Sequence, residues 1–431
     1  MSSKHSKPLV ALIGTLDTKE AEYQFATSWL ETHGCNVVIL DASTQAPLEG
    51  SSFFDLSDDS KLYRPKELLE AHPDRTDAAF SSERSANTAF ATSIMRDTTF
   101  PIGLPKFMLT TMASGDVSEY IGESDICIMP SVGDISGSLN AITLTTLQSA
   151  LAAISGMAHA RHSSKQRTAS SPAHGNDHKP MIAISMFGVT TVAVNQISDL
   201  LKQQGYEPVA FHATGSGGRS MERLIREGFF AAVIDLTTTE ICDHLYDGVL
   251  SAGPDRLIAA AEQGLPQVVS FGALDMINFG SLSSLPSRYK LQDGSDQGPL
   301  HHTEDGTPVY EHNSQVTLVR TSSSQSKELG EHLVSNLLKG LDRLPEGRKA
   351  APIKIIFPKA GISAMDGAEG VWDDPEARSA LLNSSQATLE KNAKQSGHQV
   401  PITIESHEYH INSHEFAEIV VEQAIQLLSN E

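Results

Sequence analysis

Short runs of apolar residues alternate along most of this chain with longer stretches that have the spacing of an amphipathic helix. In the first half, residues 8–14, 35–41, 106–112 and 125–129 form such runs, and a long helical pattern covers residues 140–158. Continuous apolar runs are typical of strands that are buried on both faces. Because strands and helices alternate, the pattern predicts a parallel, doubly wound sheet.

The second half repeats this arrangement. The strands that we predict there cover residues 181–186, 207–211, 231–236, 267–271, 316–320, 353–357 and 402–405. A helical pattern covers residues 416–428 and ends the chain. Residues 284–313 lack a sustained apolar period, so we predict a long loop there.

The polar segment 159–179 is rich in serine and histidine and has no hydrophobic period, which is typical of a linker. We therefore predict an α/β protein with two Rossmann-like, doubly wound domains and mostly parallel sheets. The first domain comprises residues 1–158, and the second comprises residues 180–431.

The composition restricts the possible partners. A length of 431 residues suits two or three domains, and the formal net charge of −21 argues against nucleic acid or an anionic membrane as a partner. The sequence contains no apolar run of 18 residues, so we expect no membrane span. The N-terminus lacks the apolar core of a signal peptide. Cys35, Cys127 and Cys242 are odd in number and far apart, which favours free thiols in a reducing compartment. We expect a soluble cytoplasmic protein.

The most informative motif joins residues 207–211, which we predict to form a short buried strand, to a helix that we expect to start near Ser220. Glycines let backbone N–H groups converge, and a helix N-terminus adds donors and a partial positive charge. A phosphate or a carboxylate is therefore the expected guest. The motif lacks the ending of a P-loop, and a plain tight turn is the alternative. Its residues are Thr214, Gly215, Ser216, Gly217 and Gly218.

Hydroxyl-bearing and small residues recur where other predicted strands end. Ligands of open α/β sheets bind beyond the carboxyl ends of the strands, so these turns predict one polar crevice. Ser, Thr and Asp are also common helix caps, and capping alone is the alternative at any one turn. The candidate anion-binding residues at these turns are Thr15, Asp17, Thr18, Lys19, Ser114, Gly115, Thr237, Thr238 and Thr239.

Carboxylate and imidazole groups in the second half are candidates for acid–base chemistry or for a divalent metal ion. Asp275 and His312 are the preferred pair, and Asn278, Asp366 and His410 are further candidates. A hydrogen-bonded surface cluster is the alternative for each residue. The sequence contains no nucleophile elbow, Cys-His pair or His-Glu-x-x-His zinc motif.

Nine segments, spread in order over nearly the whole chain, resemble those of one known family. They are residues 13–19, 103–106, 112–116, 186–191, 211–218, 235–240, 251–257, 272–279 and 312–317. The family is widespread and largely uncharacterised, and it includes the N-terminal ATP-binding domain of the tomato mosaic virus resistance protein. The resemblance implies two Rossmann-like domains and a homodimer, and it implies ATP binding more firmly than any reaction.

The sequence departs from that family at one place. Members usually carry a Gly-Gly-Ser-Gly-Gly-Thr loop after a strand, whereas residues 83–92 retain only Ser85 and Thr88 of it. Glu83 would repel a phosphate, and residues 63–80 are too short for the usual helix and strand. We expect the first half to lack a strand and its phosphate loop, because of either an altered site or an imperfect gene model.

These features predict a homodimer that binds ATP with Mg²⁺, or a related phosphorylated or carboxylated small molecule. If the protein is an enzyme, metal-assisted phosphoryl or acyl-type chemistry suits the crevice. A binding or regulatory module without turnover is the alternative, favoured by the altered loop and by the lack of a recognised nucleophile. An oxidoreductase is a weaker hypothesis, since no acidic ribose partner follows a full glycine fingerprint.

Overall fold

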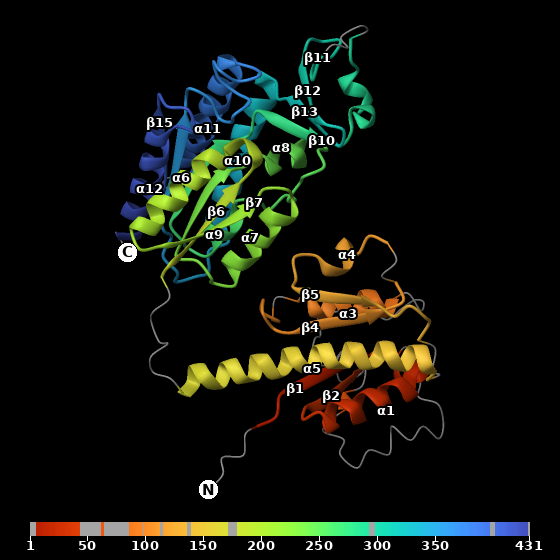
Figure 1. The fold of residues 1–431 in the computed structure, drawn as a ribbon. Helices are drawn as coiled ribbons and strands as arrows, with labels where there is room; N and C mark the ends of the chain where they lie inside the picture. The colour runs from red at the N-terminus through yellow and green to blue at the C-terminus, as the bar shows by residue number, and fades with distance from the viewer. Residues whose placement is uncertain are drawn as a thin grey trace. The chain divides into compact units, whose positions relative to one another are not determined.

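The chain forms two compact units, residues 1–177 and 178–431, and Figure 1 shows both. The structure is a computed structural model. It describes residues 6–43, 62–63, 86–97, 99–112, 115–135, 139–170, 179–292, 298–396 and 401–429.

The first unit contains two small parallel sheets flanked by helices. Its strands are β1 (Leu9–Gly14), β2 (Asn36–Asp41), β3 (Leu62–Tyr63), β4 (Lys106–Thr110) and β5 (Ile126–Pro130). Its helices are α1 (Leu16–Thr32), α3 (Ala86–Met95), α4 (Ser118–Ile121) and α5 (Ala141–Ser170). One sheet has the order β1-β2-β3, and the other pairs β4 with β5.

These two sheets are not hydrogen-bonded to each other over the described residues. Both α3 and α5 nevertheless pack on β1 as well as on β4. The two helices therefore span the interval between the sheets. The sequence predicted that this half lacks a strand. Among the described strands, the position without a strand lies between β1 and β4.

The last helix of the first unit is longer than the sequence pattern predicts. α5 ends at Ser170, so residues 159–170 of the predicted linker are helical. Polar residues without an apolar period can still continue a helix, because helix propensity does not require an apolar face. Among the described helices, only Ala141–Ser164 is long and apolar enough to cross a membrane, a test that core helices of soluble proteins also pass. Leu147 and Leu151 of this helix are buried in the unit.

The second unit is built around a six-stranded parallel sheet. Its strands are β6 (Met181–Met186), β7 (Glu207–His212), β8 (Ala232–Thr237), β9 (Gln267–Gly272), β14 (Ile353–Pro358) and β15 (Ile402–His407). The order is β15-β14-β9-β8-β6-β7, and all neighbours run parallel. The chain leaves β6 for β7 on one side and then reaches β8 on the other, so the topological switch point lies at the carboxyl end of β6.

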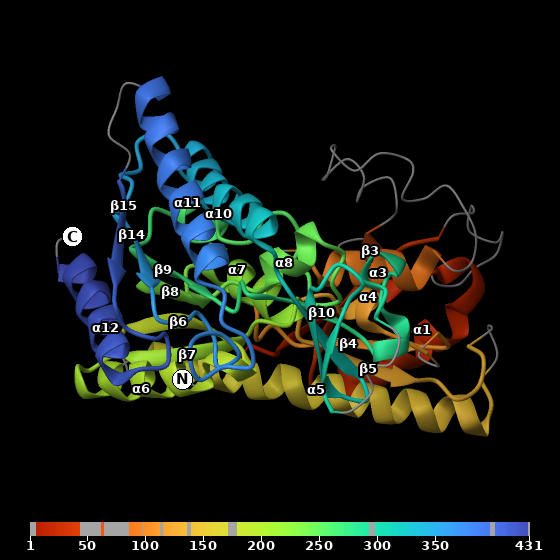
Figure 2. The same ribbon diagram turned by 90° about the horizontal axis from the view of Figure 1, so that it is seen from above.

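Helices cover both faces of this sheet (Figure 1 and Figure 2). They are α6 (Thr191–Gln203), α7 (Ser216–Arg226), α8 (Glu240–Leu245), α9 (Ile258–Glu262), α10 (Ser323–Asp342), α11 (Pro375–Ser396) and α12 (His414–Ser429). α6 and α12 pack together on one face, whereas α7, α9 and α10 lie on the other with α11 against α10. The predicted Rossmann-like α/β fold with mostly parallel sheets is confirmed.

A separate antiparallel sheet has the order β10-β13-β12-β11. Its strands are β10 (Met276–Phe279), β11 (Leu300–His302), β12 (Pro308–Asn313) and β13 (Val316–Arg320). The long loop predicted over residues 284–313 is therefore wrong in part, because it contains β11 and β12. Both strands are only partly buried, so they lack the continuous apolar run of a covered strand.

Two local predictions around the glycine motif are also wrong. β7 is an edge strand and is only partly buried, rather than a buried strand. α7 starts at Ser216 rather than near Ser220, and its N-cap is Gly215 with a φ of 83°. Glycine adopts positive φ without a Cβ clash, so Gly215 makes the sharp turn and the following glycines form the first helical turn.

A buried guanidinium joins the elements on the α7 side of the sheet. Arg256 pairs with Glu222 of α7 at 3.1 Å, with Asp235 of β8 at 2.6 Å and with Glu240 of α8 at 2.8 Å. Glu222 also accepts two backbone N–H bonds at the start of α9. Burial alone would lower the pKa of Arg256, but the three carboxylates outweigh it and raise that pKa.

Arg256→Met should strongly destabilise the second unit, because three buried carboxylates would lose their shared cation. We expect the free energy of unfolding to fall by about 3–5 kcal/mol. Urea denaturation followed by the fluorescence of Trp372, in a Trp29→Phe background, measures this change.

Arg343→Met is the matched control, because the Arg343–Asp255 pair is about half exposed. Its cost should stay below about 1 kcal/mol. Equal losses in the two variants would contradict the role assigned to Arg256.

Candidate functional site

The glycine motif after β7 does hold an anion, but the anion belongs to the chain itself. The backbone N–H groups of Gly215 and Gly218 donate to Oε1 of Glu240, at 2.7 and 3.1 Å. Glu240 is fully buried, and its Oε2 accepts a bond from Nε of Arg256. The convergent donors at the N-terminus of α7 therefore stabilise an internal carboxylate.

The surroundings oppose the second anion that we predicted for this motif. Three carboxylates share the guanidinium of Arg256, which leaves an excess of negative charge beneath the loop. Among the remaining motif residues, Thr214 is half-buried and Ser216 is exposed. A Cβ at Gly217 would lie 1.8 Å from the carbonyl oxygen of His212, so a bulky residue there would disturb folding. A substitution of Gly217 is thus no clean test of binding.

The three consecutive threonines that begin with Thr237, the last residue of β8, are fully buried. The hydroxyl of Thr237 lies 2.7 Å from that of Thr190, and Thr238 donates to a carbonyl oxygen of β9. Oγ1 of Thr239 accepts a bond from Asn278. These bonds fasten the turn between β8 and α8 to its neighbours, which speaks against the ligand-donor role that we predicted.

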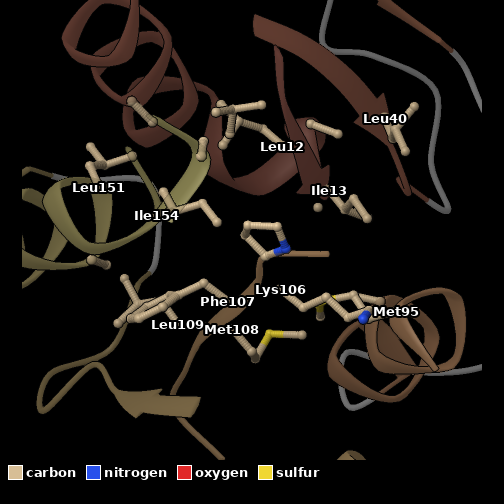
Figure 3. A pocket seen from close by; sticks show the side chains of 18 of the residues that line it. Leu12, Ile13, Leu40, Met95, Lys106, Phe107, Met108, Leu109, Leu151 and Ile154 are labelled. Carbon is tan, nitrogen blue, oxygen red and sulfur yellow. The ribbon is translucent and has the colours of Figure 1, made fainter. Parts of the chain in front are cut away.

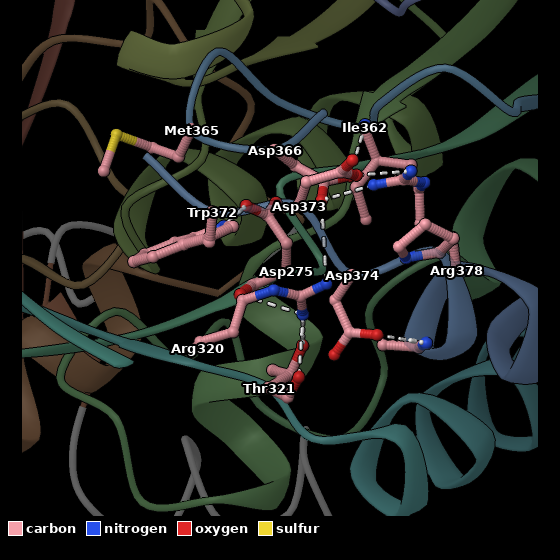
Figure 4. A network of polar contacts seen from close by, with 12 residues as sticks. Asp275, Arg320, Thr321, Ile362, Met365, Asp366, Trp372, Asp373, Asp374 and Arg378 are labelled. Carbon is pink, nitrogen blue, oxygen red and sulfur yellow. Dashed lines mark hydrogen bonds and ion pairs between the residues drawn. The ribbon is translucent and has the colours of Figure 1, made fainter. Parts of the chain in front are cut away.

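A second buried network lies at the carboxyl ends of β9 and β14 (Figure 4). Oδ2 of Asp275 accepts bonds from Oγ of Ser363 at 2.8 Å and from Nε1 of Trp372 at 2.9 Å. Oδ1 of Asp275 is buried and has no hydrogen-bond partner among the described residues. Asp275 therefore fastens the loop between β14 and α11 while one of its oxygens remains unmatched.

Electrostatics at this network favour the protonated form of Asp275. Burial and the nearby carboxylate of Asp366 raise the pKa of Asp275 to about 6, although Arg320 partly opposes this shift. Asp366 itself pairs with Arg378 at 2.8 Å and with Arg320 at 3.7 Å. Nε2 of His410 lies 3.0 Å from the carbonyl oxygen of Ser363, so this predicted candidate borders the same network.

The structure does not bring the two preferred catalytic candidates together. Asp275 directly precedes β10 and is fully buried, whereas His312 is an exposed residue of β12. Asp275 lies next to the pair Met276–Arg320. His312 follows Glu311, which pairs with Thr317, and Thr317 pairs with Phe279 at the opposite end of the ladder. Three residues of strand separate these ends by about 10 Å. A joint acid–base or metal role for Asp275 and His312 is not supported by this arrangement.

In the first unit, the predicted residues after β1 do converge. Oγ1 of Thr15 lies 3.0 Å from Oγ1 of Thr18, and Nζ of Lys19 lies 3.4 and 3.3 Å from these two atoms. We call these three residues the Lys19 cluster. Thr15 is the N-cap of α1, so the cluster lies at a helix N-terminus. The backbone N–H of Leu16 already donates to Oδ1 of Asp41.

Two predicted residues of this unit lie outside what the structure describes. They are the side chain of Asp17 and the whole of Ser114. Gly115 follows β4 and is exposed. No group of three His, Cys, Asp or Glu side chains suited to a metal ion occurs among the described residues. The Mg²⁺ site stays a prediction.

A cavity of about 620 Å³ lies beside the Lys19 cluster, a volume typical of ligand pockets. Figure 3 shows Leu12 and Ile13 of β1 facing β4 across it. Leu151 and Ile154 of α5 flank the cavity on one side, and Met95 of α3 flanks it on the other. Two members of the cluster line the cavity, so polar donors meet a largely apolar chamber.

The sequence did not reveal which residues, distant along the chain, contact the predicted site residues. Glu240 follows the three threonines directly, but its contact with the glycine motif joins residues 25 positions apart. Trp372 lies 97 positions from Asp275. The only local signal was an acidic residue that directly follows a threonine run, which is equally typical of a helix N-terminus.

The fold and these sites define a two-unit α/β protein with parallel sheets, polar strand ends and an apolar chamber in the first unit. The chain belongs to the uncharacterised protein family UPF0261. The model of the family's C-terminal domain matches residues 179–428, and that of its N-terminal domain matches residues 8–85 and 64–163.

Relatives cover nearly the whole chain. A UPF0261 protein of Mesorhizobium japonicum is 36% identical over 434 residues, with 95% of this chain and 97% of the relative covered. A UPF0261 protein of Clostridium tetani is 33% identical, with 97% and 98% covered. The ToMV resistance protein Tm-1 of Solanum lycopersicum is 31% identical over 466 residues, with 99% of this chain and 56% of Tm-1 covered. That alignment is longer than the 431 residues of this chain, so Tm-1 has residues that this chain lacks.

Asp275→Asn should change how the stability of the second unit depends on pH. The folded pKa of about 6 exceeds the ordinary value of 3.8, so the folded state holds this proton more tightly. The contribution of Asp275 is therefore fully present below pH 4 and is lost as the pH rises to about 6. Asparagine does not ionise. The free energy of unfolding of the variant, relative to that of the wild type, should therefore rise by up to about 3 kcal/mol between pH 4 and pH 7.

Urea titrations at pH 4, 5, 6 and 7 would measure this difference. Trp372 fluorescence in a Trp29→Phe background isolates the second unit, since the chain has two tryptophans. Asp342→Asn, at an exposed residue, serves as the control. A difference for Asp275→Asn that stays constant over this pH range would show that the carboxyl group does not titrate there.

Proposed function

We propose that the protein binds ATP or another phosphorylated small molecule at the Lys19 cluster. The observation that carries the proposal is the convergence of an ammonium group and two hydroxyls within 3.4 Å at the N-terminus of α1. Lys19 has non-helical backbone angles, so Leu16–Thr18 form a separate turn ahead of the regular part of α1. The proposal therefore rests on the side-chain donors rather than on a helix dipole. Phosphate oxygens are suited to accept from such a group of donors.

Charge pairing supports this assignment over the glycine motif. Lys19 forms no ion pair with any residue in the described ranges, whereas Arg256 near the glycine motif is fully used by three carboxylates. Asp41 occupies the N–H of Leu16 and sets one boundary of the site. Of these two predicted anion sites, the glycine motif and the Lys19 cluster, the Lys19 cluster therefore offers a phosphate a cation without an ion pair among the described residues.

The cavity gives room for the remainder of such a ligand, and a carboxylated metabolite would use the same donors. Mg²⁺ would accompany ATP as the ion of its phosphates. The resemblance stated above, which implies ATP binding and a homodimer, supports both as parts of the same proposal, and the composition favours a cytoplasmic location.

Binding without turnover is the second candidate function, and one observation favours it. The preferred acid–base residue, Asp275, is fully buried, and its partners Ser363 and Trp372 hold it in the interior. A regulatory module that binds a nucleotide needs no such group. Phosphate release from bound ATP distinguishes the two candidates, since an enzyme consumes what it binds.

Lys19→Met should weaken ATP binding by about 10- to 100-fold, because a charge-assisted hydrogen bond contributes about 1.5–3 kcal/mol. Isothermal titration calorimetry with ATP, with and without Mg²⁺, measures the affinity. Samples from the same titration can be assayed for phosphate release.

Lys327→Met provides the control, because Lys327 is an exposed lysine of α10 in the other unit. It should bind ATP like the wild type. Equal affinities of the wild type and Lys19→Met would remove the Lys19 cluster from the site, and a failure of the wild type to bind would reject the proposal.

A further inference from the structure

The loop between β14 and α11, residues 359–374, covers the topological switch point of the second unit. The backbone N–H of Ala364 donates to the carbonyl oxygen of Val189, in the turn after β6, at 2.9 Å. Met365 and Trp372 belong to an apolar cluster against which Val189 also packs. The loop therefore lies on the residues that follow β6, where ligands of such folds bind.

The outer part of this loop, residues 367–372, is a turn that is bonded mainly within the loop, and we call it the Trp372 turn. The N–H of Gly367 donates to the carbonyl oxygen of Trp372 at 3.2 Å, and the N–H of Trp372 donates to that of Met365 at 3.0 Å. A Cβ at Gly370 would lie 2.3 Å from the carbonyl oxygen of Met365, so this tight path requires glycine there.

The two parts of the loop are fastened in different ways. The inner part is held by backbone bonds, such as that from Ala273 to the carbonyl oxygen of Ile362 at 2.9 Å. Among the described residues, the only hydrogen bond from the Trp372 turn to chain outside the loop runs from Nε1 of Trp372 to Oδ2 of Asp275, at 2.9 Å. Apart from the packing of its indole ring, the turn is thus held by Asp275, and it can move without breaking backbone bonds to the sheet.

The charges around Asp275 balance when its carboxyl group is protonated (Figure 4). Arg378 of α11 pairs with Asp366 at 2.8 Å and with Asp373 at 2.7 Å, and Arg320 of β13 lies 3.7 Å from Asp366. Two guanidinium groups therefore match two carboxylates of the loop. Asp275 would add a third carboxylate, and its Oδ1 is buried without a hydrogen-bond partner among the described residues.

The other titratable groups near Asp275 add no cation. Burial raises the pKa of both Cys242 and Asp243 of α8, and neither group carries a positive charge. Asp374 accepts a bond from the first turn of α11. Nδ1 of His410 accepts from the N–H of Asn412 at 3.1 Å, so this imidazole is uncharged while the bond stands.

Opening of the Trp372 turn would release a proton. Burial and the carboxylate of Asp366 hold the pKa of Asp275 at about 6 in the closed turn, whereas exposure to water restores the ordinary value of 3.8. The bonds from Ser363 and Trp372 favour the ionised form, but they do not outweigh burial. The closed turn therefore loses stability relative to the open turn as the pH rises from about 4 to about 6, and the opening constant rises by up to about 100-fold.

We propose that Asp275 is a proton-operated latch, whose protonated form keeps the Trp372 turn closed over the switch point and whose ionisation favours opening of the turn. Opening would uncover the residues that follow β6, so the latch regulates access to the switch point of the second unit. The inference does not rest on the proposed nucleotide site, which lies in the first unit.

Hydrogen exchange of the full-length protein tests the latch, measured by mass spectrometry at pH 4, 5, 6 and 7 and corrected for the intrinsic rate at each pH. The Trp372 turn should be less protected than β6 and β8 at every pH, because it opens without global unfolding. Its protection should fall by up to about 100-fold between pH 4 and pH 7. In Asp275→Asn the side chain keeps an acceptor for Trp372 but does not ionise, so protection of the turn should not vary with pH.

Acrylamide quenching of Trp372 fluorescence in the Trp29→Phe background gives a second readout. Quenching should increase with pH when Asp275 is present and stay constant in Asp275→Asn. Asp342→Asn, at an exposed residue, is the control and should behave like the wild type.

Three results would overturn the proposal. Equal protection of the turn and of the strands β6 and β8 would show that the turn opens only on global unfolding. A protection of the wild-type turn that stays constant from pH 4 to pH 7 would show that no proton controls it. A pH dependence that persists in Asp275→Asn would assign the proton to another group. If Asp275→Asn does not fold, the comparison of the turn with β6 and β8 in the wild type decides.

Discussion

Parallel strands covered by helices on both faces depend on complete pairing of their backbone groups. A buried N–H or C=O without a partner costs free energy, and no water is at hand to compensate. The second unit meets this requirement with six consecutive parallel strands. In the first unit, the described sheets stop at β1 and at β4, and the unmatched edges face each other. The cavity, its apolar flanks and the bond from Tyr23 to the carbonyl oxygen of Ile13 in β1 follow from that interruption.

Carboxylates of the chain itself occupy several helix N-termini. Asp41 accepts from the first residue of α1, Glu222 accepts two N–H groups at the start of α9, and Glu240 accepts from the start of α7. Each bond satisfies donors that a helix leaves unpaired. Chemistry that suits an external phosphate is thus used to fix the fold, whereas the start of α1 keeps a cation, Lys19, without an ion pair among the described residues.

The sequence predicted the fold well where the pattern was local. Covered strands such as β6 and β9 are continuous apolar runs, so their positions and parallel pairing followed directly. β11 and β12 were missed because partly exposed antiparallel strands carry no such run. At the sites, the Lys19 cluster was found because its members are neighbours in sequence. Glu240 and Trp372 were missed as partners, since contacts over 25 and 97 positions leave no local signal.

The most direct test is residue-resolved hydrogen exchange of the free protein, comparing β1 and β4 with the interior strands β6 and β8. Amides on the unpaired edges have no strand partner, so about half of the amides in β1 and β4 should exchange much faster than those of β6 and β8. Uniform protection of all four strands would contradict the open edges, because it would mean that the first unit already contains the strand that its described part lacks.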